Sequence, residues 1–170
     1  SAATALVLLQ RAEYLNSVID DNFQVAVDSV AAENAKRLAE WDKMRDAKKA
    51  ELVAQKKSDK DIEEILGQLP APLLLQDPEK NYGEVLKTYQ QLIDNFPESQ
   101  YVVDAMYNIS FVKETEGKQL KARGYSSGDS ENRWAIEGDK KQKESLKIYQ
   151  DLAVRFPDSK YASEAYNRIG

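Results

Sequence analysis

Two stretches of this chain carry nearly the same residues: YQQLIDNFPESQYVVDAMYNIS at Tyr89–Ser110 and YQDLAVRFPDSKYASEAYNRIG at Tyr149–Gly170. The second follows the first at a constant offset of 60 residues. In each stretch an apolar stripe at helical spacing ends at Phe-Pro, and a second helical pattern begins after the next serine. Proline cannot continue a helix and serine favours the start of one, so each stretch predicts two helices joined by a tight turn. Two units that share such a turn are typical of a stacked repeat array.

The composition excludes several classes of function. Charged residues make up 31% of the chain but the net charge is only -5, which argues against a nucleic-acid-binding platform. Cysteine and histidine are both absent, so disulfides, thiolate chemistry and the commonest general base and zinc ligand are excluded. Acid pairs such as Asp20/Asp21 are sequence neighbours, whereas glycosidase-type catalysis needs carboxylates across a cleft. The sequence therefore predicts no catalytic residue, no cofactor and no bound metal.

Residues 1–72 are expected to form an N-terminal helical hairpin region. Ala2–Ile19 has a helical stripe that includes Tyr14, and Phe23–Lys57 contains neither proline nor glycine, which predicts one long helix antiparallel to the first. The alternative is that Phe23–Lys57 pairs with another copy as a coiled coil, although its heptad pattern is irregular. A homo-oligomer therefore remains an open alternative. The apolar start, Ala2–Leu9, is too short to span a membrane, so no span is expected.

Residues 73–170 are expected to hold the repeats. Helical stripes precede each Phe-Pro and follow each serine, whereas the run Gly117–Asp139 is rich in glycine, serine and charge. That composition predicts a loop or a partly ordered insertion. The last helix begins at Ser159 and stops at Gly170, so the final repeat is expected to be truncated. No segment alternates with a period of two long enough for a strand, and the fold class is expected to be all-α.

The repeated units contain AMYNIS at 105–110, AYNRIG at 165–170 and the pattern Y-x-x-L-x-x-x-F-P-[ED]-S-x-Y-x-x-[DE]-A. With these residues, Asn81–Gly170 resembles tetratricopeptide (TPR) repeats. The longer pattern is similar to the segments found in bacterial envelope proteins of the β-barrel assembly lipoprotein and Tol-Pal coordinator type. The resemblance implies a solenoid of helical hairpins that binds a protein or peptide. It also implies a periplasmic or outer-membrane-associated location, with a cytoplasmic one as the alternative.

The repeat offset departs from the family. A standard repeat spans about 34 residues, so about 26 of the 60 residues are in excess. The longer F-P-x-S turn accounts for about three, and the remaining ~23 match the run at 117–139. The insertion is therefore expected at the turn between the two helices of one repeat, where loop closure costs grow slowly with length.

The resemblance also implies a ligand groove on the first helix of each repeat, opposite the packing stripe. Carried over by position, the candidate groove residues are Asp104, Tyr107, Asn108, Phe111, Glu114, Glu164, Asn167 and Arg168. An acidic and aromatic groove would suit a peptide with basic and apolar residues, and a plain solvated face is the alternative. The recurring tyrosines Tyr89, Tyr101, Tyr149 and Tyr161 are expected to pack between helices with their hydroxyls at the surface.

The expected function is a non-catalytic protein-interaction scaffold, part of a larger and envelope-associated bacterial protein. The alternative is a structural module that self-associates through the long helix at 23–57.

Overall fold

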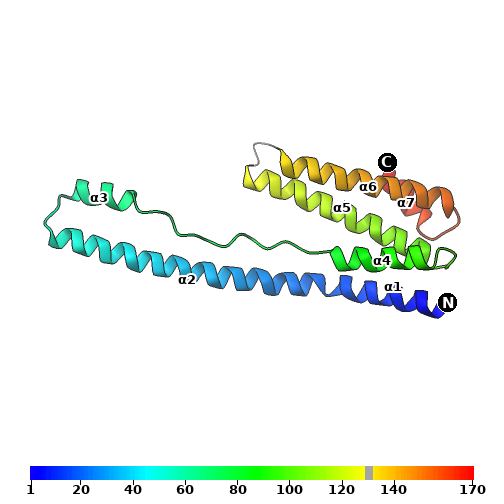
Figure 1. The fold of residues 1–170 in the computed structure, drawn as a ribbon. Helices are drawn as coiled ribbons and strands as arrows, with labels where there is room; N and C mark the ends of the chain where they lie inside the picture. The colour runs from blue at the N-terminus through cyan, green and yellow to red at the C-terminus, as the bar shows by residue number, and fades with distance from the viewer. Residues whose placement is uncertain (129–131) are drawn as a thin grey trace. The chain divides into compact units, whose positions relative to one another are not determined.

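The computed structural model describes residues 1–128 and 132–170, and in this part of the chain the regular elements are all helices (Figure 1). They are α1 (Ala2–Ser17), α2 (Ile19–Ala54), α3 (Asp59–Gly67), α4 (Gly83–Asn95), α5 (Val102–Ser127), α6 (Arg133–Arg155) and α7 (Ala162–Ile169). The all-α prediction is confirmed for these residues. The chain forms two compact units, one from Ser1–Ile19 with Asn81–Gly170 and one from Asp20–Lys80.

The first helix pairs differently from the prediction. It was expected to form a hairpin with the long helix, but α1 packs against α4. Ala5 and Ala12 have no exposed surface, which allows a close approach of α1 to its neighbours, and Leu9 joins the core. Tyr14, which was expected on the buried stripe, is 66% exposed. The two compact units divide at 19/20 and 80/81.

The repeated Phe-Pro sequence folds into the same turn twice. Phe96 ends α4 at φ -134° and ψ 56°, and Phe156 ends α6 at φ -130° and ψ 58°. The residue before a proline is held away from the helical region, so each helix ends there. The serine N–H then donates to the carbonyl of the phenylalanine, at 2.9 Å for Ser99 and 3.1 Å for Ser159. The predicted helix ends at the Phe-Pro turns are confirmed. The predicted helix starts at the serines are wrong, because α5 and α7 begin at Val102 and Ala162, each after a tyrosine at the N-cap.

The run at 117–139 is not the predicted loop. Its described residues are helical, because α5 extends to Ser127 and α6 begins at Arg133; residues 129–131 lie outside the described residues. The additional residues lengthen both helices of the α5–α6 pair instead of forming an inserted loop. Charged side chains join the two helices along their length, with Lys113 Nζ 2.8 Å from Glu144 Oε2 and a further ion pair between Lys121 and Asp139.

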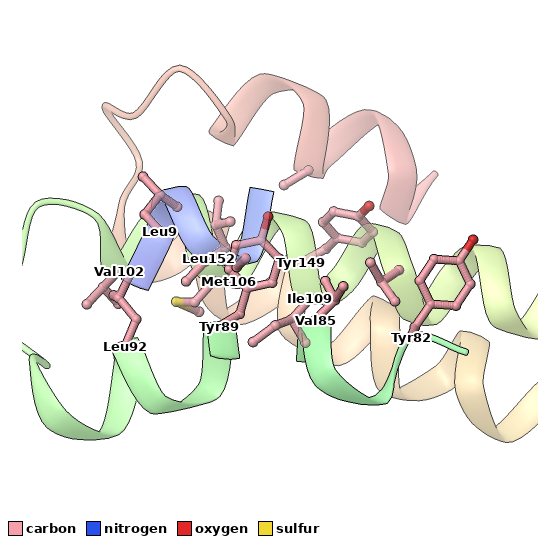
Figure 2. Packing of buried hydrophobic residues seen from close by; sticks show 14 of the residues in the cluster. Leu9, Tyr82, Val85, Tyr89, Leu92, Val102, Met106, Ile109, Tyr149 and Leu152 are labelled. Atoms are coloured by element: carbon pink, nitrogen blue, oxygen red, sulfur yellow. The ribbon is translucent and has the colours of Figure 1, made fainter. Parts of the chain in front are cut away.

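One hydrophobic core holds the first unit together (Figure 2). It takes Leu9 from α1, Tyr89 and Leu92 from α4, Met106 from α5 and Leu152 from α6. Leu92 and Leu152, which occupy equivalent positions in the repeated sequence, are both fully buried. The recurring residues thus mainly build the core, and the polar side chains of α5 and α7 are left for the surface.

The second unit is a long helix with a returning segment. A small cluster of Leu52, Ile62 and Leu66 joins the end of α2 to α3. After α3 the chain has no regular structure until α4, and side chains of α2 bind the backbone of this segment. Within the described residues, none of the helices combines the length and apolar character needed to cross a bilayer.

Candidate functional site

The candidate groove residues lie on α5 and α7. Five come from α5 and three from the eight-residue α7, and the Phe-Pro turn between α6 and α7 brings the two helices together. Interactions between the helices are direct, from Arg168 to Glu114 and from Tyr161 to Asp104. The two predicted halves of the groove therefore form one surface, which we call the α5–α7 face. Its members are Asp104, Tyr107, Asn108, Phe111, Glu114, Glu164, Asn167 and Arg168.

Arg168 is the centre of this face. Its Nη1 donates to both carboxylate oxygens of Glu114, at 2.9 and 2.8 Å, and its Nε donates to Glu164 Oε1 at 3.0 Å. The guanidinium carbon also lies 5.2 Å from the centre of the Phe111 ring. A planar guanidinium has enough donors for two carboxylates and still presents a face to an aromatic ring. One arginine thus ties four of the candidate residues, itself included, into a cluster.

The ionisation of this cluster follows from its contacts. Burial alone would raise the pKa of Glu114, but a hydrogen bond from Lys118 and the positive charges of Arg168 and Lys118 outweigh burial, so the pKa lies below its usual range. Burial alone would lower the pKa of Arg168, but hydrogen bonding to Glu164 and the charge of Glu114 raise it instead. Both groups are charged at neutral pH and stabilise each other. Lys118 adds a second positive charge beside the Glu114 carboxylate, with its Nζ 2.9 Å from Oε1.

Aromatic rings form the second part of the face. Tyr107 stacks on Tyr161 with ring centres 4.4 Å apart and an interplanar angle of 16°. It also meets the edge of Tyr149 at 6.0 Å and lies 6.5 Å from Phe111. Tyr107 is half-buried and has three aromatic neighbours, so its ring contributes to packing. Phe111 is the outer member of the group and is 41% exposed.

Asp104 is occupied by neighbours on the α7 side. The Tyr161 hydroxyl donates to Asp104 Oδ1 at 2.7 Å, and Lys160 Nζ lies 3.7 Å from the same oxygen. Burial, the largest cause, and the bond to Asp104 raise the pKa of Tyr161 above its usual value. The tyrosine therefore remains a neutral donor at any physiological pH.

The two asparagines of the candidate set behave differently. Asn108 turns back on its own helix, where its Nδ2 donates to the Asp104 carbonyl at 2.8 Å. Asn167 is exposed on α7. Its carboxamide offers both a donor and an acceptor at the surface.

Sequence reasoning missed three contributors: Tyr161, Tyr149 and Lys118. The Tyr149 hydroxyl is 3.4 Å from Glu114 Oε2, while the ring itself is only 1% exposed. The two tyrosines were expected to pack, and they do, but their hydroxyls are directed at the acids of α5. The signal for Tyr161 was its recurrence in register with Tyr101. No comparable signal pointed to Lys118.

The arrangement changes the expected character of the face. An acidic and aromatic groove was expected, and in the structure the carboxylates of Asp104, Glu114 and Glu164 are each engaged by a cation or a hydroxyl. The part that remains available is the Phe111 ring and the polar edge around Asn167. Across residues 1–128 and 132–170, no group of three or more acidic side chains converges in a way that would hold a metal ion.

Comparison of the chain with protein-family models, with curated proteins and with solved structures found no match.

Proposed function

We propose that the unit built from Ser1–Ile19 and Asn81–Gly170 is a non-catalytic protein-binding module of the TPR type. The repeated Phe-Pro turn supports this, because the same backbone geometry and the same hydrogen bond recur at Phe96 and Phe156. A chain that builds one turn twice stacks equivalent helices side by side, as solenoid repeats do. Such stacks present extended surfaces and bind other proteins by them.

The observation that carries the proposal is the exposure of Phe111 on the α5–α7 face. The Phe111 ring is 41% exposed, the guanidinium of Arg168 lies over its face at 5.2 Å, and the ring of Tyr107 is 6.5 Å away. A rigid aromatic side chain with polar neighbours is typical of residues that contribute most to binding energy. The acids nearby are already neutralised, so the partner is a protein segment with an apolar side chain for Phe111 and polar backbone atoms for Asn167.

The test is a comparison of two truncations of exposed apolar side chains, one on the α5–α7 face and one outside it. Phe111→Ala removes the exposed ring of the face, and Val154→Ala removes an apolar side chain that is 78% exposed on α6. Immobilised wild-type and variant proteins would be compared for the proteins they retain from the source cell. A partner retained by the wild type and by Val154→Ala, but lost with Phe111→Ala, supports the proposal. Equal retention by all three would exclude the α5–α7 face.

The compartment is proposed from the sequence pattern alone. The F-P-[ED]-S segments resemble those of bacterial envelope proteins, and this favours a periplasmic or outer-membrane-associated protein over a cytoplasmic one. Fractionation of the source cell followed by immunodetection of the chain tests the location directly.

A further inference from the structure

Three side chains of α2 bind the backbone of a segment that returns along the helix. Trp41 Nε1 donates to the Pro70 carbonyl at 2.8 Å, and Arg37 Nη1 donates to the Leu73 carbonyl at 2.8 Å. Asn34 makes two bonds, accepting from the Leu75 N–H at 2.8 Å and donating to the Leu75 carbonyl at 3.0 Å. We call Asn34, Arg37 and Trp41 the clamp, and residues 70–80 the strap. Positions three and four apart share one face of a helix, so the clamp forms a single row.

The clamp recognises main-chain atoms, and the side chains of the strap contribute little apolar burial. Leu73 is 84% exposed, and Leu74 and Leu75 are 41% and 40% exposed. An exposed hydrogen bond adds only about 1 kcal/mol to stability, because water competes for both partners. The far end of the strap is held by Lys80, whose Nζ is 2.7 Å from Asp20 Oδ1. A segment held in this way opens more readily than a segment packed in a core.

The turn between α2 and α3 is strained. The Lys57 N–H donates to the Leu52 carbonyl and the Lys56 N–H to the Val53 carbonyl, which is the bonding pattern of a Schellman turn. That turn needs a left-handed residue, and glycine is the usual choice. Here Lys56 takes the position, with φ 57°. A residue with a Cβ destabilises this conformation, so the closed turn competes with a straight helical continuation through Gln55 and Lys57.

For residues 1–54 to part from residues 58–170, this turn is the backbone segment that has to change conformation, and the packing of α1 on α4 and of Leu52 on Ile62 has to separate together with the clamp–strap bonds. Ser58 favours the closed form, because its Oγ accepts from the Asp61 N–H at 3.2 Å and caps α3. Lys56 favours the open form, because residues 55–57 are all good helix formers without left-handed strain. The turn therefore has two accessible states, one closed and one straight. The same contacts between residues 1–54 and residues 58–170 can form within one chain or between two chains.

We propose that two copies of this chain exchange their parts on either side of Lys56. The arm, residues 1–54, of one copy packs against residues 58–170 of the other, and each clamp binds the strap of the other copy. The clamp–strap bonds, the cluster of Leu52 with Ile62 and the packing of α1 on α4 are all conserved in the exchanged dimer. The dimer gains the relief of left-handed strain at two turns, and exchange of identical elements is a low-cost route to dimers.

The first test weakens the open form without touching the clamp. Lys56→Gly removes the penalty of the left-handed turn, and so favours the closed monomer. We expect the dissociation constant of the dimer to increase by about tenfold for each turn, or roughly a hundredfold for the two turns of the dimer. Lys49→Gly, at an exposed interior position of α2, is the control for loss of helix propensity. Sedimentation equilibrium of the full chain measures the constants. A wild-type chain that stays monomeric at every concentration overturns the proposal, as does an unchanged constant for Lys56→Gly.

The second test identifies which surfaces meet. The chain has no cysteine, so engineered thiols are its only thiols. Asn34→Cys and Leu75→Cys are made in separate chains, mixed, and oxidised. Exchange predicts a disulfide-linked dimer, because the clamp position of one copy faces the strap of the other. Lys36→Cys mixed with Leu75→Cys is the matched control, since Lys36 is exposed on the opposite side of α2. A dimer that links Lys36→Cys as efficiently as Asn34→Cys would exclude exchange through the clamp.

Discussion

Gly117 of α5 and Gly138 of α6 face each other across a close contact between the two helices. A Cβ added to either glycine would lie 2.7 Å from the carbonyl oxygen of the other. Real Cβ atoms do not come so close to a backbone oxygen, so only glycine fits at both positions. The two residues, which resemble helix breakers in the sequence, are what allows the long α5–α6 pair to form.

Gly117→Ala and Gly138→Ala are each expected to destabilise the protein. Alanine has the better helix propensity, by about 1 kcal/mol, but the forced separation of the helices costs about 1–3 kcal/mol and exceeds that gain where the backbone cannot move. Urea unfolding followed by far-UV circular dichroism measures the effect. Gly67→Ala is the control, because nothing lies within 4 Å of its Cβ position, and it should be neutral or stabilising. Equal stability of Gly117→Ala and Gly67→Ala would contradict the close packing.

Glu114→Gln is expected to lower stability at neutral pH and to have less effect in acid. The pKa of Glu114 is depressed in the folded protein by Lys118 and Arg168, despite its burial. Its stabilising contribution is therefore fully present above the unfolded pKa and is lost as the pH falls through the folded one. We expect a loss of about 1–2 kcal/mol at pH 7, as for a hydrogen bond to a charged group. Chemical denaturation at several pH values checks this, with the exposed Glu40→Gln as control. A pH-independent difference would argue against the ion pair as its source.

Tyr107→Ala is expected to lower the stability of the protein more than Phe111→Ala does, because Phe111 is the more exposed of the two rings. Tyr107 is half-buried and stacks on Tyr161 at 4.4 Å, so its truncation is expected to cost about 2 kcal/mol of stability. Phe111 is 41% exposed, and its truncation is expected to cost about 1 kcal/mol or less. Thermal unfolding of both variants measures the difference. If Phe111→Ala proved the more damaging of the two, the ring would be part of the core and unsuitable for testing partner binding.

The buried tyrosine hydroxyls predict opposite effects of the same substitution. Among the described residues, Tyr89 Oη finds no hydrogen-bond partner, whereas Tyr161 Oη donates to Asp104 at 2.7 Å. Tyr89→Phe removes an uncompensated polar atom and should be neutral or stabilising. Tyr161→Phe should cost about 1–2 kcal/mol, because it leaves a partly buried carboxylate with fewer donors. The free energies of unfolding of the two variants are compared directly, and a larger loss for Tyr89→Phe would imply a partner for that hydroxyl.

Asn34→Ala should release the strap without unfolding the first unit. The Leu75 amide loses its acceptor, and we expect its hydrogen exchange to accelerate by about tenfold, the equivalent of one lost bond. NMR-detected exchange of the full chain measures this rate. Gln24→Ala is the control, because Gln24 bonds only to Asp28 on its own helix in the described contacts. Unchanged exchange at Leu75 would show that Arg37 and Trp41 hold the strap by themselves.

The boundaries at the repeated turns were predictable because their causes are local. Pro97 and Pro157 lack an N–H and restrict the residue before them, so helices end at Phe96 and Phe156 in any tertiary context. The prediction of a loop at 117–139 was wrong because the deciding contacts are not local. Its glycines and serines lower helix propensity locally, but packing between α5 and α6 outweighs that preference. Gly117 and Gly138 lie about twenty residues apart, and nothing local shows that they meet.

The contacts that the candidate residues make could not be predicted from the sequence. Repeat position placed Glu114 and Arg168 on equivalent helices. Their pairing joins residues 54 positions apart and depends on how α7 folds back over α5. The same holds for Tyr161 and Asp104, which are 57 positions apart. Charges that look free in the sequence are compensated in the structure, because only the fold decides which charges become neighbours.

The sequence by itself determined the all-α class and the helix ends at the repeated Phe-Pro turn. Each of these follows from backbone chemistry within a few residues, or from a spacing that puts side chains on one side of a helix. Only the tertiary structure decided that α1 packs on α4, that Gly117 meets Gly138, and that Arg168 neutralises Glu114. These are contacts between distant parts of the chain, and burial and charge pairing select them only when the helices are packed together.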